Sequence, residues 1–241
     1  MIKMEKFPNS ENAYGIRDDR FSYRWLDMWG DVQKYMAIGP IPKDDTTNVP
    51  GEWTTTQTGT SPVTVSATPG EVILFTTAAT EYAGANAQLS GTQFELATAK
   101  PAYFGIKCTL SDATQSDFLV GLCGIDTTLT NASASHAVNV GAGGVFFSKL
   151  DGVTAINFQS WATSSVSATA AVSTAMDTAV HTYEIYWDGY SLMAYLDGVL
   201  VATLTSGLPS VALTPSICFR AGEAAAKTLK INWIRAFQVR G

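Results

Sequence analysis

The sequence predicts an all-β fold, an antiparallel β-sandwich that follows an N-terminal arm. From Trp53 onward, short runs rich in Val, Ile, Thr, Phe and Tyr alternate with clusters of Gly, Pro, Asn, Asp and Ser. This alternation is typical of many short strands joined by turns, and no helical periodicity interrupts it. Two Asp-Gly pairs, Asp188-Gly189 and Asp197-Gly198, stand between alternating apolar residues. Asp and Gly supply the positive φ that a two-residue hairpin loop needs.

The individual strands follow from the positions of these turn clusters. The two Asp-Gly pairs predict a three-stranded meander near the C-terminus. The last strand has apolar residues on both faces, with Ile231, Trp233 and Phe237 on one and Ile234 on the other, which is typical of a central strand. Residues 162–178, almost entirely Ala, Ser, Thr and Val, fit a weakly specified strand or a loop. The expected strands are 62–66, 71–77, 85–89, 93–97, 101–111, 117–125, 143–149, 153–161, 181–187, 191–196, 199–204, 215–221 and 228–239.

Residues 1–50 form the arm, and residues 51–241 form the sandwich domain. The arm holds 15 of the 36 Asp, Glu, Lys and Arg residues of the chain, so its composition differs from the rest. Its large apolar residues fall at helical spacing, which predicts one apolar stripe on a short helix that ends at Gly39-Pro40. Gly30 weakens a helix, so a short strand remains the alternative. The stripe consists of Phe21, Trp25, Met28, Trp29, Val32 and Met36.

Composition excludes several classes of protein. Hydrophobic residues make up 46 % and charged residues 15 % of the chain, enough apolar material for a sizeable core. The net charge of −6 opposes binding to a phosphate backbone, so we expect no nucleic-acid partner. No apolar run is long enough to cross a bilayer, and residues 1–6 lack the apolar stretch of a secretory signal. Three cysteines are an odd number, which predicts buried free thiols and synthesis in a reducing cytoplasm.

The late strands resemble a known group of enzymes. Residues 181–188, 194–198 and 231–238 are similar to the late strands of laminarinase-like β-glucanases, and Tyr195-Leu196-Asp197-Gly198-Val199 recurs in laminin G-like domains. Both families share the concanavalin A-like jelly roll, which this resemblance implies for the chain. Those glucanases act through Glu-x-Asp-x-x-Glu or Glu-x-Asp-x-Glu, which puts carboxylates on one face of a strand. No two acidic residues are two positions apart in this sequence, so we expect no enzyme, and Glu184 is interpreted as a solvated strand residue.

A second resemblance points to function. Residues 86–96, 100–107 and 116–122 look like a pattern found in virion proteins of tailed bacteriophages. It implies a non-enzymatic capsid decoration, or cement, protein that is made in the host cytoplasm and lies on the capsid surface, bound to the major capsid protein. We expect a homo-oligomer, a trimer or a dimer. The expected capsid contacts are Phe21, Trp25, Met28 and Trp29 of the arm, with packing of the arm on its own sandwich as the alternative.

The alternative function is a carbohydrate-binding, lectin-like module of a phage tail fibre or surface protein. Tyr186, Tyr190 and Tyr195 are the candidate platforms for stacking on sugar rings, although cross-strand packing would also explain them. No cofactor is expected. Neither is a metal, because the sequence has only two histidines, His136 and His181, and no Cys-x-x-Cys pair.

Laminin G-like relatives can hold calcium at the loops of the sandwich. By analogy, Asp126 or Asp151 could contribute oxygen ligands, but no loop carries the repeated Asp and Asn residues of a strong site.

Overall fold

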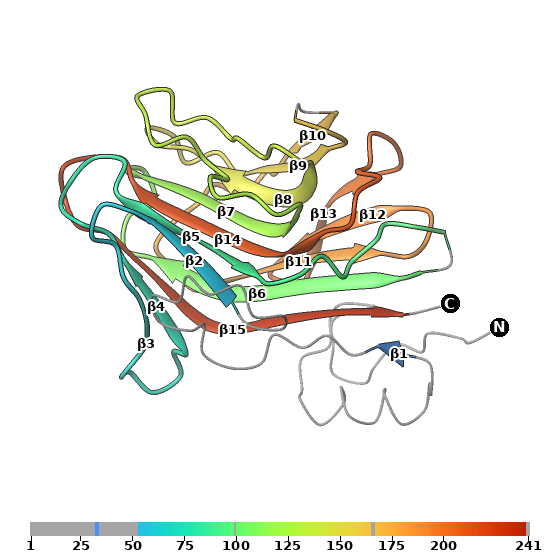
Figure 1. The fold of residues 1–241 in the computed structure, drawn as a ribbon, viewed down its shortest axis with the longest axis horizontal. Coiled ribbons are helices and arrows are strands. Elements are labelled where there is room, and N and C mark those ends of the chain that lie inside the picture. The colour runs from blue at the N-terminus through green and yellow to red at the C-terminus, as the bar shows by residue number, and fades with distance from the viewer. Residues whose placement is uncertain (1–31, 34–52, 99, 165–166, 240–241) are drawn as a thin grey trace.

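The fold is a sandwich of two antiparallel sheets that lie face to face (Figure 1). The computed structural model describes residues 32–33, 53–98, 100–164 and 167–239, and all regular structure among them is strand. Within these ranges no helix is long and apolar enough to cross a membrane. The predicted all-β sandwich is confirmed.

Eight strands form the first sheet, which we call sheet A. Its order is β13-β12-β11-β6-β15-β4-β3, with β1 paired to the far end of β15. The long strands β6 and β15 lie at its centre, so the last strand is central as predicted. The bounds are β1 Val32–Gln33, β3 Val63–Val65, β4 Ile73–Thr76, β6 Ala102–Leu110, β11 His181–Trp187, β12 Leu192–Leu196, β13 Val199–Leu204 and β15 Thr228–Val239.

Seven strands form the second sheet, sheet B, in the order β10-β9-β8-β7-β14-β5-β2. One of its strands corrects the sequence analysis, which listed no strand at 53–58, and another, at 168–171, confirms the strand alternative for part of 162–178. The bounds are β2 Trp53–Thr58, β5 Gly84–Leu89, β7 Ser116–Cys123, β8 Gly144–Lys149, β9 Asn157–Trp161, β10 Ala168–Ala171 and β14 Thr214–Ala221. The strand expected at 93–97 is absent, because Phe94 makes only a single bridge, to Leu213.

The main core lies between the sheets and is built by alternate residues of facing strands. Phe118 and Val120 of β7 meet Tyr183 and Ile185 of β11, and all four are fully or almost fully buried. The rings of Phe118 and Tyr183 lie 5.2 Å apart across the two sheets. Each such burial contributes roughly 1.5–3 kcal/mol to stability, so a core of this size holds the sheets together.

The two Asp-Gly pairs turn the chain in different ways. At Asp197-Gly198 the strands are joined by two residues, with φ of 50° and 83°, as the sequence predicts. The prediction of a two-residue loop is wrong for the β11–β12 connection. There Trp187 pairs with Leu192, so the loop has four residues. There the Asp188 carboxylate accepts the backbone N–H groups of Tyr190 and Ser191 at 2.7 and 2.6 Å, which stabilises the longer turn.

A β-bulge changes which face of β15 each residue occupies. Ile231 pairs with Cys108 and Trp233 pairs with Lys107, so Asn232 is an extra residue in the strand. Beyond it, Ile234 joins the main core and Trp233 does not. The predicted face that ran from Ile231 through Trp233 is therefore wrong, since the alternation starts again at the bulge.

The arm is described only at Val32 and Gln33. These residues form β1 and pair with Val239 and Gln238 of β15, so the chain is extended where helical spacing predicted a helix. The strand alternative fits this position. Phe21, Trp25, Met28 and Trp29 lie outside the described residues, and the division into arm and domain stays a prediction.

His181, at the start of β11, lies between two carboxylates. Its Nδ1 is 2.6 Å from Asp197 Oδ2 and its Nε2 is 2.8 Å from Asp177 Oδ1. Burial lowers the pKa of the imidazole, but the two hydrogen bonds and the two negative charges together outweigh burial, and the pKa is raised above 6.5. The charged form therefore holds the hairpin turn at Asp197 to the neighbouring loop.

This arrangement predicts a fall in stability as the pH rises. A group whose pKa is higher in the folded state stabilises the fold fully below its unfolded pKa, and loses that effect as the pH passes its folded pKa. Urea unfolding at a series of pH values should show the free energy of unfolding of the wild type falling above about pH 6.5. H181Q should lack that part of the pH dependence. Identical profiles for the two proteins would contradict the prediction.

Candidate functional site

The outer face of sheet B, turned away from sheet A, is the candidate site. Alternate residues of its strands point to this face, among them Asn86 and Gln88 of β5, Asp117 of β7 and Arg220 of β14. Polar side chains on an open sheet face could meet a ligand. Here residues 124–143, which join β7 to β8, lie on that side of the sheet (Figure 1).

Apolar contacts hold the middle of this connection to the sheet. Leu129 and Val140 pack on Leu119, Phe146 and other side chains of the central strands. Close approach of β8 to β7 also requires Gly121, because a Cβ at that position would collide with the backbone of the neighbouring strand. The centre of the face is therefore a second, smaller core. Its buried members are Leu119, Cys123, Leu129, Val140, Phe146 and Cys218.

A histidine–aspartate pair fastens one part of the connection. His136 Nδ1 lies 2.8 Å from Oδ2 of Asp117, whose other oxygen accepts the backbone N–H of Asp151 at 2.8 Å. Burial raises the pKa of the Asp117 carboxyl, and these hydrogen bonds offset the rise only in part. His136 has φ of 40°, a conformation that is uncommon for a residue with a side chain and that the surrounding contacts maintain.

Arg220 fastens the same region from β14, although its side chain is almost completely buried. Its Nε donates to Thr130 Oγ1 at 2.9 Å. One terminal nitrogen donates to Thr58 Oγ1 at 2.8 Å and to the carbonyl oxygen of Tyr82 at 3.2 Å. A buried charge requires such partners, so Arg220 joins β2, the approach to β5 and the 124–143 connection.

Two amide side chains of β5 hold the start of the connection. Asn86 Nδ2 donates to the carbonyl oxygen of Asp126 at 2.8 Å. Gln88 accepts the backbone N–H of Asp126 at 2.8 Å, and its Nε2 donates to the Gly124 carbonyl oxygen and to Ser216 Oγ. The amides therefore satisfy the backbone of residues 124–126, which would otherwise lie unpaired on the sheet.

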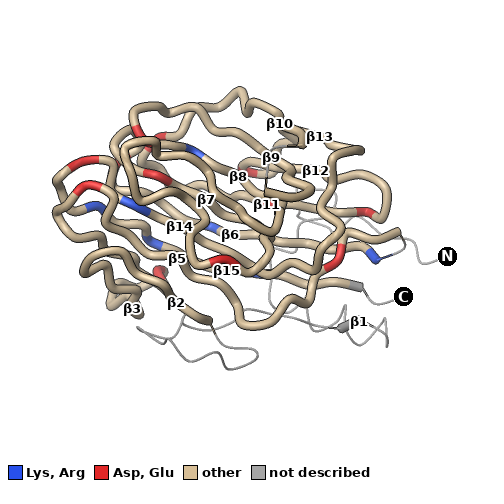
Figure 2. The backbone as a smooth tube through the Cα atoms, turned by 45° about the horizontal axis from the view of Figure 1, so that its top comes forward, with Lys and Arg blue, Asp and Glu red and all other residues tan. Residues whose placement is uncertain are grey.

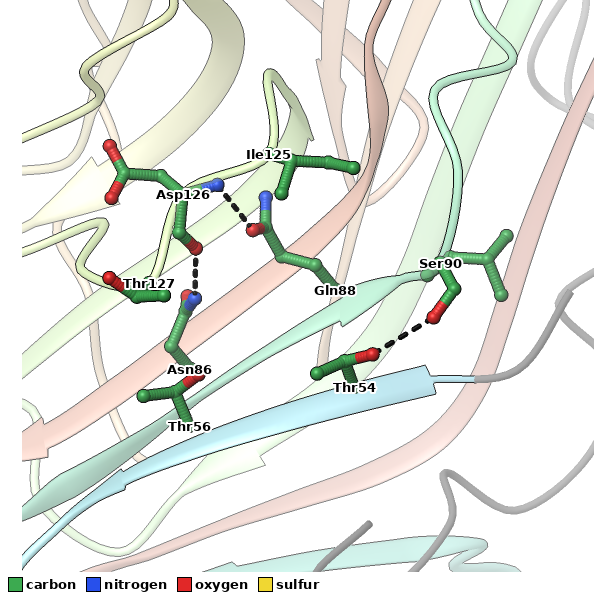
Figure 3. A pocket seen from close by; sticks show the side chains of 9 residues that line it. Thr54, Thr56, Asn86, Gln88, Ser90, Ile125, Asp126 and Thr127 are labelled. Atoms are coloured by element: carbon green, nitrogen blue, oxygen red, sulfur yellow. Dashed lines mark hydrogen bonds between the residues drawn. The ribbon is translucent and has the colours of Figure 1, made fainter. Parts of the chain in front are cut away.

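A small pocket of about 200 Å³ remains beside these amides (Figure 3). Hydroxyl groups of Thr54 and Ser90, 2.9 Å apart, lie at one end, and Ile125 and Asp126 at the other. Asn86 Oδ1 is buried and has no hydrogen-bond partner among the described residues. The lining residues are Thr54, Thr56, Asn86, Gln88, Leu89, Ser90, Ile125, Asp126 and Thr127.

The pocket offers hydrogen bonds and an apolar wall, and a single carboxylate. Asp126 is the one acidic residue of the lining, and its oxygens accept the backbone N–H groups of Thr128 at 3.0 Å and Gly141 at 2.8 Å. Glycoside hydrolysis in most families requires two carboxyl groups across the scissile bond. In the described part of the chain, no group of three or more His, Cys, Asp or Glu side chains could hold a metal ion.

Of the three tyrosines predicted to stack on sugars from the protein surface, only one is exposed. Tyr190 is 72 % exposed, in the β11–β12 loop. Tyr186 and Tyr195 are buried, which contradicts a surface position, because they pack with Tyr103 on the outer face of sheet A. Trp187 is in the core, as expected.

Glu184 differs from its interpretation as a solvated residue. It is 3 % exposed and accepts the Tyr103 hydroxyl at 2.7 Å. Asp151, named with Asp126 as a possible calcium ligand, lies near His136 instead, with Oδ2 3.8 Å from Nε2.

Sequence reasoning missed the residues that fasten the connection. Asn86 and Gln88 carry a signal that could have found them, because two amides at alternate positions of one strand point to the same face. The sequence signal for Arg220 is weaker, because it is only a single charge at the end of a long apolar run. His136 and Asp117 are 19 residues apart, and nothing in their spacing predicts that they meet.

No known protein family and no curated protein matches the chain. Solved structures do match. The carbohydrate recognition domain of Emp46p in its potassium-bound form is 12 % identical, covers 84 % of this chain and 96 % of its own, and has a TM-score of 0.54. The β-glucanase of Bacillus licheniformis is 14 % identical, with 83 % and 99 % covered and a TM-score of 0.56. The carbohydrate recognition domain of Emp47p is 11 % identical, with 88 % and 98 % covered and a TM-score of 0.56.

At such identities the likeness establishes the fold alone. The chain has the concanavalin A-like jelly roll that is shared by lectin domains and glucanases, as the resemblance of its late strands implied. It covers almost the full length of these structures.

The fastening by Arg220 predicts a large loss of stability in R220M. Removing the guanidinium takes the donor away from Thr130, Thr58 and the Tyr82 carbonyl, at a cost of about 1–3 kcal/mol for each buried group left unsatisfied. Lys230 is the control, because it is partly exposed and pairs with Glu71 at 3.1 Å on the surface. K230M should cost less than about 1 kcal/mol. Urea unfolding measures both, and equal losses would show that Arg220 does not fasten the connection.

Proposed function

We propose that this chain is a non-enzymatic structural protein of a tailed-bacteriophage head, a decoration protein that binds and stabilises the lattice of major capsid protein. One observation carries the proposal. The outer face of sheet B, where a jelly roll could hold a substrate, is occupied by the 124–143 connection of the chain itself.

The polar side chains of that face support this proposal because they serve the fold. Asn86, Gln88, Asp117 and Arg220 all bind the connection or the segments beside it. A face whose charged and amide groups are already paired offers few contacts to a substrate. The similarity of residues 86–96, 100–107 and 116–122 to virion proteins lies in β5, β6 and β7, within the same sandwich.

The partner contact assigned to the arm is part of this proposal. Phe21, Trp25, Met28 and Trp29 bring large apolar and aromatic groups to a chain segment that also carries many charges, a composition suited to an interface. The sandwich then acts as the rigid body that lies on the capsid surface, and the arm makes the contact.

Binding to heads tests the role of the arm. Heads assembled without this chain are mixed with the purified full-length protein, and bound protein is measured after sedimentation. Replacing the four arm residues together by Ala should weaken binding by at least about tenfold, because a few aromatic anchors carry most of an interface. Y190A, which removes an exposed aromatic outside the arm, is the control. Unchanged binding of the fourfold variant would refute the role of the arm, and failure of the wild type would refute the whole proposal.

A carbohydrate-binding role is the second candidate, and the pocket between β2 and residues 125–127 favours it. Its volume of about 200 Å³ is on the scale of a single sugar residue. Hydroxyl and amide groups on one side and Ile125 on the other match the polar edge and apolar face of a sugar ring. Carbohydrate recognition domains are among the structures of the same fold, which adds support to this candidate.

A variant that fills the pocket tests this candidate. Thr56 lines the pocket from β2, so T56F should abolish binding to any glycan that the wild type retains on a glycan array. T64F makes the same change on β3, a strand of sheet A that contributes nothing to the pocket lining, and should leave binding unchanged. Absence of glycan binding by the wild type would exclude the candidate, as would equal binding by T56F.

A further inference from the structure

One side of the sandwich is formed by residues without charge. The stretches 152–176 and 199–219 contain no Asp, Glu, Lys or Arg. They include β10 and β13, which end sheet B and sheet A on the same side, and residues 205–211, which follow β13. We call β10, β13 and residues 205–211 the uncharged edge. Figure 2 shows the tube over β10 and β13 without a blue or red segment.

The parts of the uncharged edge are in contact with one another. β10 and β13 are neighbours although they belong to different sheets. Ser160 Oγ, in the strand beside β10, donates to the carbonyl oxygen of Gly207 at 2.8 Å. A Cβ at Gly207 would also meet Ser167, just before β10. The edge is therefore one continuous surface rather than two separate uncharged loops.

β13 lacks two of the features that protect an edge strand from association, a proline and a charge, although its pairing with β12 shifts in a bulge at Val201. It pairs with β12 alone in the sheet order, and its six residues include no proline and no charge. Native edge strands commonly carry Lys, Pro or an inward charge for this purpose. Val199 is 65 % exposed and Leu200 is 51 % exposed, so two large apolar side chains at the start of β13 face solvent, one on each face of sheet A.

The opposite edge of sheet A is different. There Val65 of β3 is 60 % exposed, but charges lie beside it. The Ser66 hydroxyl donates to Glu71 at 3.0 Å, and Glu71 pairs with Lys230. Val199 also follows a charge, Asp197 in the turn before β13, so the β13 side differs in the uncharged stretch 199–219 that comes after it.

We propose that the uncharged edge binds the same edge of a second copy of this chain, related by a two-fold axis. Two copies that each carry a net charge of −6 repel, and the repulsion is smallest where neither surface carries charge. A two-fold axis brings a patch onto itself, so a single self-complementary surface is sufficient for a dimer. The association does not depend on whether the protein decorates capsids or binds glycans.

Matched valine variants test the proposal. Val199 and Val65 are both exposed strand residues at opposite ends of sheet A, with 65 % and 60 % exposure. Sedimentation equilibrium of the full-length chain over a range of concentrations should show a dimer for the wild type and for V65K. V199K should weaken dimerisation by at least about tenfold, because the dimer would bury an unpaired ammonium group. L200K, at the neighbouring position, should act in the same way.

Salt gives an independent measurement. Dimerisation through an uncharged surface should persist or strengthen between low and high ionic strength, because salt screens only the repulsion between the copies. A wild type that is monomeric at every concentration would overturn the proposal. So would a dimer that V199K and L200K leave intact, or one that V65K disrupts equally, because the contact would then lie elsewhere.

Discussion

The structure depends on how residues 124–143 are held to the outer face of sheet B. A connection of this length has many backbone groups that need partners once it leaves water. Amides from β5, a histidine–aspartate pair and the Arg220 guanidinium supply them, and an apolar cluster fills the space between. Arg220 and Asp117 could not be buried without the hydrogen bonds that the connection provides, because an unpaired buried charge costs free energy. The connection in turn needs these side chains as hydrogen-bond partners. Each part makes the other possible.

This mutual dependence constrains function. Side chains that are hydrogen bonded to the chain's own backbone have a fixed orientation and little freedom to rearrange around a substrate. Among the described residues a pocket stays accessible on this side, between β2 and residues 125–127, and it is on the scale of one sugar residue. The face is therefore largely covered and keeps a small polar pocket. The capsid decoration proposal relies on the covered face, and the carbohydrate-binding proposal relies on the pocket.

Much of the fold could be predicted from the sequence, because it is encoded locally. Asp197 and Gly198 fix a hairpin by their own backbone preferences, and alternation places Tyr183, Ile185 and Trp187 in the core. The candidate site could not be predicted in the same way. His136 reaches Asp117, and Arg220 reaches Thr58, only because the sandwich brings separate strands together. Tyr186 and Tyr195 show the same limit, since alternation gives the face of a strand and not whether that face is covered.

The bulge at Asn232 has a consequence for how this chain can vary over evolution. The extra residue resets the alternation of β15, so that Ile231 and Ile234 both reach the core although three positions separate them. Loss or gain of one residue there would turn the whole second half of the strand over. A substitution of Asn232, by contrast, affects one side chain and the 2.6 Å hydrogen bond that its Nδ2 donates to the Gly70 carbonyl oxygen. At this point a change in the length of the chain should therefore disturb the fold more than a change of residue.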